Sequence, residues 1–403
     1  MYVLVLNSGS SSVKYQLVSI QDESLASKGL VEKIGTKEAF YSYAIGNGEK
    51  QKEIRPILNH EEALSIVFNT LTEKGVIRNL GEISAIGHRV VHGGAKFAET
   101  VLVTDEVMQD IRDCIELGPL HNPHNLKGIE VCARLIPGVP QLAVFDTAFH
   151  QTMPEYACLY ALPYELYTRH RVRRYGFHGT SHRFIASRAA EMLGKSADTI
   201  NIINCHLGNG ASVCAIQNGK SVDTSMGFTP LEGLIMGTRS GDMDPAIIQY
   251  IMGKEKRSIQ EVDSMLNKES GLLGISGTTN DVRELFECIR KGGAEAKRAE
   301  LALAMMTYRL KKYVAAYMGV LNGKADAVVF TAGIGENNAH VRKHALAGLE
   351  FMGIEVDQSK NENAVPDADI AAESSRVRVL VIATNEEILI ARDAAAYVRS
   401  IQK

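Results

Sequence analysis

The sequence has few features of a secreted, zinc-binding or membrane protein. Its 403 residues include six cysteines, and no two of them are spaced as Cys-x-x-Cys. Scattered cysteines argue against a disulfide framework or a zinc site, and they are typical of a reducing compartment such as the cytoplasm. The apolar run at residues 1–6 is too short for the core of a signal peptide or for a membrane span.

A large excess of one charge is also missing. The chain has 44 lysines and arginines against 47 aspartates and glutamates, which gives a formal net charge of −3. This balance gives no reason to expect nucleic acid or an anionic membrane as a partner. Hydrophobic residues make up 45% of the chain, so a substantial core is expected, and the length predicts two or three domains.

Several common site motifs are absent as well. The sequence contains no G-x-x-x-x-G-K-[ST] phosphate loop, no G-x-G-x-x-G fingerprint and no H-E-x-x-H zinc motif. A nucleotide site in this chain must therefore use another kind of loop. The spacing of the twelve histidines does not suit zinc.

Strand-like and helix-like patterns alternate along the chain, which predicts α/β layers. A strand, a tight turn and a second strand are predicted at residues 2–18, and the same arrangement is predicted at residues 199–216. We interpret this as a weak internal duplication that gives two domains of similar design. Small polar turns between apolar strands are common, so the match alone decides little. A long helix is predicted over residues 295–317, with Leu301, Met305 and Leu310 on its core face.

Small or charged polar residues directly follow five of the predicted strands. In open α/β sheets, ligands bind beyond the carboxyl ends of the strands, so these segments predict one central cleft. Three of them are glycine- or serine-rich turns, at residues 7–14, 206–212 and 333–337. Small residues allow backbone N–H groups to approach an anion, and the third turn also precedes a helix. Taken singly, each turn is equally well explained as an ordinary connection.

Other short polar segments of the sequence contain arginines, histidines and one aspartate that are candidates for catalysis or binding. Arg89 and Arg239 each lie close to glycines, and a guanidinium group can hold a carboxylate or a phosphate through two hydrogen bonds. A surface salt bridge is the ordinary alternative for each arginine. Three short segments, 120–124, 145–150 and 175–182, supply His121, Asp146 and His178. The other histidines of these segments, together with His92, are expected to be supporting groups.

These segments, taken together, resemble the acetokinase family, whose members are acetate kinases. The resemblance runs nearly from end to end, from the N-terminal Leu-Asn-Ser-Gly-Ser-Ser-Ser to the Thr-Asn-Glu-Glu at residues 384–387. The motifs are specific as an ordered set: Asn-Ser-Gly-Ser-Ser-Ser, His-Arg-Val-Val-His-Gly-Gly, Phe-Asp-Thr-Ala-Phe-His, Gly-Phe-His-Gly-Thr-Ser-His, Gly-Asn-Gly-Ala-Ser, Gly-Thr-Arg-Ser-Gly-Asp and Gly-Ile-Gly-Glu-Asn.

The resemblance implies an α/β fold of two duplicated, ribonuclease-H-like domains of the actin type, with ATP in a central cleft. It implies that residues 1–148 plus 385–403 hold the acyl substrate and phosphate, and that residues 149–384 hold the nucleotide and the dimer contact. It further implies a homodimer, ATP or ADP as co-substrate, and Mg²⁺ as the metal with Mn²⁺ as an alternative. The implied reaction is reversible phosphoryl transfer from ATP to acetate, which gives ADP and acetyl phosphate.

The family pattern also assigns roles to individual residues of this sequence. The residues that match catalytic positions are Arg89, His121, Asp146, His178 and Arg239. Those that match the acyl site are Arg89, Val91, Leu120 and Pro230, and those that match magnesium positions are Asn7 and Glu386. The residues expected at the nucleotide and its phosphates are Ser10, Ser12, Lys14, His206, Leu207, Gly208, Asn209, Gly210, Asp281, Val282, Arg283, Gly333, Ile334, Gly335, Glu336 and Asn337.

The implied chemistry joins two anions, so neutralisation of charge should dominate it. A carboxylic acid such as acetate ionises near pH 4.3, roughly the Glu value, and needs no general base at neutral pH. We therefore expect Asp146 to orient Mg²⁺ or its waters and not to remove a proton. The two arginines would offset the repulsion between the carboxylate and the γ-phosphate.

Two other functions remain open from the sequence. A kinase for propionate or butyrate is the nearest, because one methylene in an apolar pocket changes binding by only about 1–3 kcal/mol. Val91 favours a small acid. A non-catalytic, actin-like nucleotide-binding protein is the alternative from another class, although nucleotide binding alone does not require two arginines. A sugar kinase fits less well, because it must deprotonate a hydroxyl group.

Overall fold

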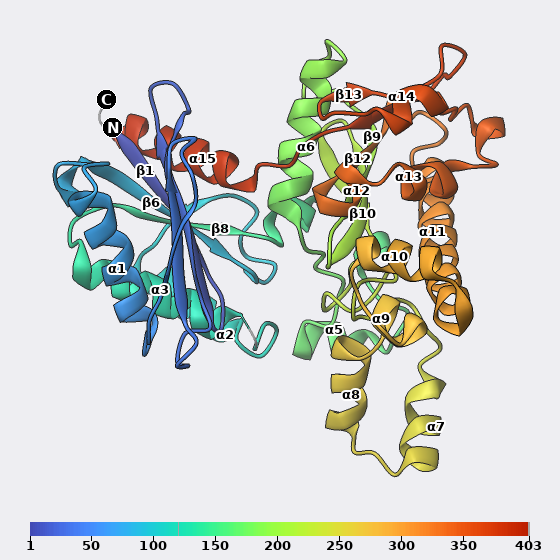
Figure 1. Cartoon of the computed structure of the whole chain (residues 1–403), viewed down its shortest axis with the longest axis horizontal. Coiled ribbons are helices and arrows are strands. Elements are labelled where there is room, and N and C mark those ends of the chain that lie inside the picture. The colour runs from blue at the N-terminus through green and yellow to red at the C-terminus, as the bar shows by residue number, and fades with distance from the viewer. Residues whose placement is uncertain (120, 402–403) are drawn as a thin grey trace. The chain divides into compact units, whose positions relative to one another are not determined.

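A computed structural model describes residues 1–119 and 121–401, and the chain forms two compact units (Figure 1). The first unit contains Met1–Ala148 and the C-terminal segment that begins at Asn385. The second unit contains Phe149–Thr384. The second unit is thus inserted in the sequence of the first.

The described part of the first unit contains an eight-stranded sheet in the order β5-β4-β3-β2-β1-β6-β8-β7. Its strands are β1 (Tyr2–Ser8), β2 (Ser12–Ser19), β3 (Leu25–Glu32), β4 (Phe40–Ile45), β5 (Gln51–Ile54), β6 (Ile83–Val90), β7 (Val101–Leu102) and β8 (Gln141–Phe145). Its helices are α1 (His60–Glu73), α2 (Asp105–Asp113), α3 (Asn122–Leu135) and α15 (Glu386–Ile401). Short 3₁₀ turns lie at Leu80–Glu82 and Ala148–Thr152.

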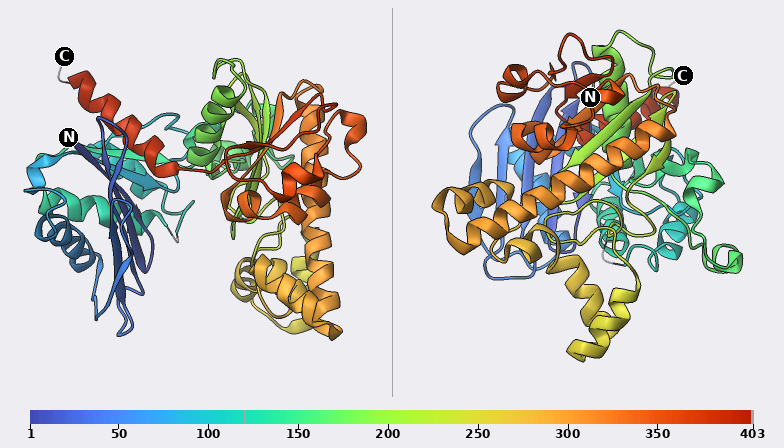
Figure 2. Two further views of the ribbon diagram at one scale, coloured as in Figure 1. Left: turned by 45° about the horizontal axis from the view of Figure 1, so that its top comes forward. Right: turned by 90° about the vertical axis from the view of Figure 1, so that its right-hand side faces the viewer.

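Helices cover both faces of this sheet. Successive side chains of a strand point to opposite faces, so β1 alternates between two cores. Leu4 and Leu6 pack with α1 and α3, whereas Val3 and Val5 pack with α15. Figure 2 shows α15 as the red helix that lies along the sheet. The continuous apolar run of β1 is explained by this burial on both sides.

The described part of the second unit contains a six-stranded sheet in the order β11-β10-β9-β12-β14-β13. Its strands are β9 (Ile202–Leu207), β10 (Ala211–Gln217), β11 (Lys220–Thr224), β12 (Ala327–Thr331), β13 (Ala368–Asp369) and β14 (Arg378–Val381). Its helices are α4 (Glu155–Cys158), α5 (Tyr164–His170), α6 (Gly179–Met192), α7 (Ala246–Glu255), α8 (Ile259–Lys268), α9 (Gly271–Ser276), α10 (Val282–Lys291), α11 (Gly293–Val320), α12 (Ala332–Asn337), α13 (Ala339–Leu346) and α14 (Gln358–Glu362), with a 3₁₀ turn at Glu350–Met352.

The α/β class and the internal duplication predicted from the sequence are confirmed. In the first unit β1 pairs antiparallel with β2 and parallel with β6, and β6 pairs parallel with β8. In the second unit β9 pairs antiparallel with β10 and parallel with β12, and β12 pairs parallel with β14. Both sheets therefore share one central arrangement of strands and directions.

One local prediction was partly wrong. Leu310 is buried as predicted and Met305 is half-buried, but Leu301 is 52% exposed, and Leu303 and Met306 lie on the core face of α11 with Leu310. The error is one of helical phase, because the helix begins at Gly293 and its buried stripe includes Ala296 and Ala299. Residues 355–376 contain α14 and the edge strand β13. No helix in the described ranges combines the length and the apolar character needed to cross a membrane.

Candidate functional site

The first glycine turn joins β1 to β2 and carries Asn7 at the end of β1. It closes through a hydrogen bond from the Gly9 amide to the Ser12 carbonyl oxygen, 2.8 Å long. A Cβ atom on Gly9 would lie 2.9 Å from the Ser12 Oγ atom, so a larger residue would press on this turn. Ser10 is exposed and Ser12 is half-buried. Lys14, which was expected near phosphate, forms an ion pair with Glu387 at the start of α15.

The side chain of Asn125 connects this turn with the segment that follows β6. This fully buried amide accepts a 3.1 Å hydrogen bond from the Val91 N–H and donates a 2.8 Å bond to the Ser8 carbonyl oxygen. His60 Nε2 lies 2.7 Å from the Gly9 carbonyl oxygen. Sequence reasoning missed Asn125 and His60, because an amide and a histidine on helices give no sign of a distant backbone partner.

Arg89, Asp146 and Glu386 form a charged cluster in the first unit. Arg89 lies near the end of β6, and Asp146 directly follows the neighbouring parallel strand β8. Arg89 donates from Nε and Nη2 to the two carboxylate oxygens of Asp146, over 2.9 and 2.6 Å. Its Nε atom also lies 3.7 Å from Glu386 Oε2. The Arg89 side chain is 22% exposed, and its Nη1 group does not take part in the pairing with Asp146.

The electrostatics of this cluster are set by burial and by the two carboxylates. Burial raises the pKa of Glu386, Arg89 lowers it, and Asp146 raises it further. Burial by itself lowers the pKa of Arg89, but Asp146 and Glu386 raise it by more. The guanidinium therefore stays charged, and two acids compete for it.

Asn7, Asp146 and Glu386 are oxygen donors of the type that Mg²⁺ prefers. In the described residues, no group of three or more His, Cys, Asp or Glu side chains is arranged to hold a metal ion. Mg²⁺ usually keeps several waters and binds one or two carboxylates together with substrate phosphates. A pair of carboxylates beside an amide fits such a site, and a complete protein cage is not needed.

The acyl-site residues of the first unit lie next to Asn125. Val91 is half-buried and its amide is held by Asn125. His121 is half-buried and begins α3, with its amide bonded to the Gly118 carbonyl oxygen at 3.1 Å. Leu120 lies outside the described residues.

The second glycine turn joins β9 to β10 and is closed by a 3.1 Å bond from the Gly208 amide to the Gly210 carbonyl oxygen. A Cβ atom on Gly210 would lie 3.5 Å from both Arg239 Nη1 and His178 Nε2. The turn therefore brings together the phosphate-loop residues and two of the predicted catalytic groups. The backbone carbonyl oxygen of Asn209 accepts a 3.0 Å hydrogen bond from the Gly237 amide.

His178 is oriented by hydroxyl groups and by a second histidine. Its backbone is in the left-handed conformation, with φ of 56°, at the start of α6. Its Nδ1 atom lies 2.9 Å from Ser212 Oγ, and its ring stacks on His206 at 4.2 Å between centroids. His206 Nδ1 in turn lies 2.8 Å from Ser181 Oγ. Sequence reasoning missed both serines, although each lies within a quoted motif.

Arg239 differs from Arg89 in having no acidic partner in the described residues. Its Nη1 group donates to the Pro230 carbonyl oxygen at 3.4 Å and to Met236 Sδ at 3.7 Å, which are both weak contacts. Burial lowers the pKa of Arg239. A half-buried cation without a counterion is well suited to accept an anionic ligand.

The predicted adenosine segment begins α10. Asp281 accepts a 2.8 Å hydrogen bond from the Arg283 amide and pairs with the Arg283 guanidinium at 3.1 and 2.6 Å. These bonds from Arg283 lower the pKa of Asp281 to about 2. Arg283 is mostly exposed, and Val282 is buried.

The third glycine turn begins α12, as predicted, but part of it has a structural role. Gly333 is exposed, and its carbonyl oxygen accepts a 2.9 Å hydrogen bond from Asn337. Arg342 donates to the carbonyl oxygens of Gly335 and Glu336 at 2.8 and 2.9 Å. The Glu336 carboxylate accepts a 3.1 Å bond from the Thr384 amide. Ile334 is half-buried, and Leu207 is fully buried at the end of β9.

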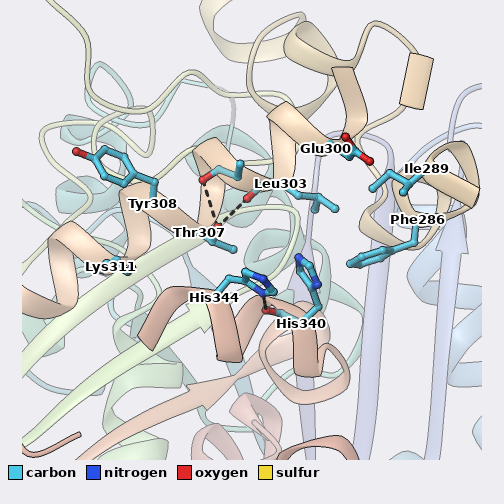
Figure 3. A pocket seen from close by; sticks show the side chains of 10 residues that line it. Phe286, Ile289, Glu300, Leu303, Thr307, Tyr308, Lys311, His340 and His344 are labelled. Atoms are coloured by element: carbon cyan, nitrogen blue, oxygen red, sulfur yellow. Dashed lines mark hydrogen bonds between the residues drawn. The ribbon is translucent and has the colours of Figure 1, made fainter. Parts of the chain in front are cut away.

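A separate cavity of about 490 Å³ lies between α10, α11 and α13. Figure 3 shows Phe286 and His340 facing one another across it, with His344 beside them. None of the predicted site residues lines this cavity. This cavity is therefore separate from the predicted site residues.

Comparisons with known proteins agree along the whole chain. The model of the Acetokinase family matches residues 2–392. An acetate kinase from Acetivibrio thermocellus is 52% identical over 403 residues, which cover 100% of both chains. The crystal structure of an acetate kinase from Porphyromonas gingivalis is 46% identical, with a TM-score of 0.93, and covers 98% of this chain and 99% of that one. A propionate kinase structure from Francisella tularensis is 44% identical, with a TM-score of 0.92 and the same coverage.

Proposed function

This chain belongs to the acetokinase family, and from that premise we propose how its residues transfer a phosphoryl group between ATP and acetate. It is an ATP:acetate phosphotransferase, with ATP or ADP as co-substrate. The observation that carries the mechanism is the cluster of Gly210, His178 and Arg239, which places a glycine turn beside a cation that has no acidic partner in the described residues.

Arg239 and His178 are proposed to contact the phosphoryl group in transit. Its negative charge spreads over three oxygens, and fixed donors stabilise that charge without reorganisation. His178 would donate from Nε2, because Nδ1 lies against Ser212 Oγ. Arg239 supplies the positive charge that allows an anionic acid to approach an anionic nucleotide.

Arg89 is proposed to bind the carboxylate of acetate through Nη1, while Asp146 holds the other side of its guanidinium. Acetate is ionised at neutral pH, since such acids titrate near pH 4.3 at about the Glu value, so no group has to remove a proton. Asp146 therefore acts by holding Arg89 in place and by offering an oxygen to the metal. His121 and Val91 are proposed to border the bound acid, together with Pro230 from the second unit.

Mg²⁺ is proposed to bind near Asn7, Asp146 and Glu386. The buried carboxyl of Glu386, with its raised pKa, would gain from a nearby dication. When bound, the metal neutralises charge on the β- and γ-phosphates. Mn²⁺ takes similar oxygen ligands and is the alternative ion.

The nucleotide is proposed to bind the second unit. The turn of Gly208, Asn209 and Gly210 would offer the backbone amides of Asn209 and Gly210 to phosphates, while the Gly208 amide closes the turn and His206 and Leu207 fix it from β9. Asp281, Val282 and Arg283 would contact the adenosine, together with the exposed Gly333 and Asn337 and the half-buried Ile334. Gly335 and Glu336 support that turn by accepting bonds from Arg342 and Thr384. On the first unit, Ser10, Ser12 and Lys14 are proposed to lie toward the terminal phosphates.

Acetate is proposed to be preferred over longer acids, although the propionate kinase relative makes propionate the second candidate. An extra methylene in an apolar pocket changes discrimination by about 10–200-fold. A comparison of kcat/KM for acetate, propionate and butyrate tests this order. A higher kcat/KM for propionate than for acetate would contradict it.

A homodimer is proposed, with α7 in its interface. This helix carries Ile247 and Tyr250, which are 42% and 65% exposed, and none of its ten described residues is buried. An apolar helix without a buried face is typical of an interaction surface. The substitutions Ile247→Glu and Tyr250→Glu should shift the mass measured by light scattering from dimer to monomer. A monomeric unmodified chain would disprove the proposal.

A reducing, cytoplasmic location is proposed because the six cysteines are scattered along the sequence without Cys-x-x-Cys spacing, and five of them are buried. The decisive experiment for the activity itself is a trap of acyl phosphate with hydroxylamine, using ATP, Mg²⁺ and acetate. Hydroxamate should accumulate only with all three present. Folded protein that binds ATP but forms no hydroxamate would overturn the proposed mechanism.

A further inference from the structure

The loop of residues 233–242, called here the arginine loop, carries Arg239 and is closed at its base by its own backbone. The Asp242 amide donates to the Gly233 carbonyl oxygen at 3.0 Å, and the Gly233 amide donates to Asp242 Oδ1 at 2.8 Å. Gly233 and Gly241 have φ values of 108° and 68°, which disfavour other residues. A Cβ atom on Gly241 would lie 2.5 Å from the Gly233 carbonyl oxygen. The base of the loop is therefore narrow.

Two side chains one turn apart on α11 bind this base. Arg309 donates from Nη1 to the Gly233 carbonyl oxygen at 3.0 Å and from Nη2 to the Asp242 carbonyl oxygen at 3.1 Å. Its Nη1 atom also lies 3.4 Å from Asp242 Oδ2. The Tyr313 hydroxyl donates to the same Oδ2 atom at 2.7 Å. The Arg309 guanidinium thus binds both ends of the loop, at Gly233 and at Asp242. The Tyr313 hydroxyl fixes the Asp242 carboxylate.

We call the contacts of Arg309, Asp242 and Tyr313 at the loop base the clamp. The charge of Arg239 explains why the loop needs it. A half-buried guanidinium without a counterion gains free energy by moving toward water, and the loop that carries it must resist that movement. Other backbone bonds hold the tip of the loop, such as Ser270 N–H to the Thr238 carbonyl oxygen at 3.0 Å. The α11 contacts act on the base through the side chains of Arg309 and Tyr313, so their removal leaves the backbone bonds of the tip in place.

We propose that Arg309, Asp242 and Tyr313 are positioning residues that hold Arg239 at the reacting phosphoryl group, an inference that rests on the proposed role of Arg239. Burial and the Asp242 charge raise the pKa of Tyr313, so its hydroxyl remains a donor. The side chains of Arg309 and Asp242 are 22% and 40% exposed, so their ion pair contributes little to overall stability. Loss of the clamp should therefore affect catalysis more than folding.

The test is steady-state kinetics of Arg309→Met, Asp242→Ala and Tyr313→Phe. A misplacement of about 1 Å can cost up to about 100-fold in rate. We expect kcat to fall about tenfold or more for the first two variants and about threefold for Tyr313→Phe, with KM for ATP within about twofold. The double variant Arg309→Met with Asp242→Ala should lose no more than either single variant, because both break one clamp. Asp242→Asn keeps an oxygen acceptor for the Gly233 amide and should recover part of the lost kcat.

Tyr308→Phe is the matched control, because this tyrosine is on the same helix and 64% exposed. It should keep the kcat of the unmodified enzyme. Unchanged kcat in the clamp variants, while Arg239→Ala is inactive, would overturn this inference and leave the proposed function standing. Full activity of Arg239→Ala would instead overturn the proposed function. A loss of kcat that appears only with a matching loss of melting temperature would show a merely structural role and also reject the inference.

Discussion

The two arginines of the predicted site belong to units built on sheets of the same design, yet their surroundings are opposite. Arg89 on β6 of the first unit is paired with Asp146 and approached by Glu386, whereas Arg239 in the arginine loop of the second unit has no acidic partner in the described residues and donates weakly to a carbonyl oxygen and a thioether. The carboxylates raise the pKa of Arg89, and burial lowers that of Arg239. In the two copies of the duplicated fold, Arg89 therefore has acidic partners, whereas Arg239 has none in the described residues.

This difference separates two tasks that a phosphoryl transfer between anions requires. A paired arginine is held rigidly but offers only part of its charge, so it suits the orientation of a carboxylate. An arginine without an acidic partner offers its whole charge to the phosphoryl group during its transfer. The proposed division of roles follows from the partners, since residue type and flanking glycines are alike in the two segments.

The largest effect should come from removal of the unpaired charge. Arg239→Ala should reduce kcat by about 10³-fold, because charge clamps of this kind contribute that much to phosphoryl transfer. KM for ATP should change far less, because Arg239 is proposed to act on the phosphoryl group in transit, whereas other residues are proposed to hold the nucleotide before the reaction. Arg239→Lys should restore part of kcat. A large rise in KM for ATP with unchanged kcat would assign Arg239 to ground-state binding instead.

The next effect concerns stability and has opposite outcomes for the two arginines. Arg89→Met leaves the buried Asp146 carboxylate without its counterion and should lower the free energy of unfolding by about 3 kcal/mol. Arg239→Met removes a cation that has no acidic partner and should leave stability unchanged or slightly raised. Denaturant unfolding of both variants measures the difference. Equal losses would show that Arg239 has a partner of equal strength.

A smaller effect is expected from Glu386→Gln, which removes the second acid beside Arg89. The folded-state pKa of Glu386 is raised, so its ionised form lowers stability as the pH rises above the ordinary value for Glu. The variant should therefore be more stable than the unmodified chain at neutral pH, and this advantage should vanish in acid, where both are neutral. Thermal melting from acidic to neutral pH, without Mg²⁺, makes the comparison. An advantage that persists in acid would contradict the charge explanation.

The smallest effect should come from His88, which precedes Arg89 and has no charged role. Burial lowers its pKa from 6.5 to about 4, so the unfolded chain binds a proton that the folded chain does not. Stability should fall as the pH drops through this window, by up to about 1.4 kcal/mol per pH unit for one proton. His88→Gln should flatten this slope by one proton, and unfolding at several pH values tests it. An unchanged slope would mean that His88 is protonated in the folded state.

Much of the fold followed from local patterns, but the charged partners did not. The strands around Asn7 and Asn209 were predictable because apolar runs end in small polar residues, and both turns formed. The pairing of Arg89 with Asp146 was not predicted, because parallel register brings together residues 57 positions apart. The role of Asn125 was also missed, since nothing near it in sequence identifies Ser8 and Val91 as its partners. Local sequence patterns predict which strand or helix a segment forms. The side chains that a residue contacts across the fold depend on the topology, which these patterns do not give.

The position of α15 has a consequence for synthesis of the chain. This last helix supplies Ile390, Ala394 and Val398 to the core beneath Val3 and Val5, and a Cβ atom on Gly87 would lie 2.3 Å from Ile390 Cγ2. The face of the sheet that carries Val3 and Val5 therefore receives α15 only after residues 386–401 have left the ribosome. During translation the inserted second unit, Phe149–Thr384, can complete its own core before α15 packs on this sheet.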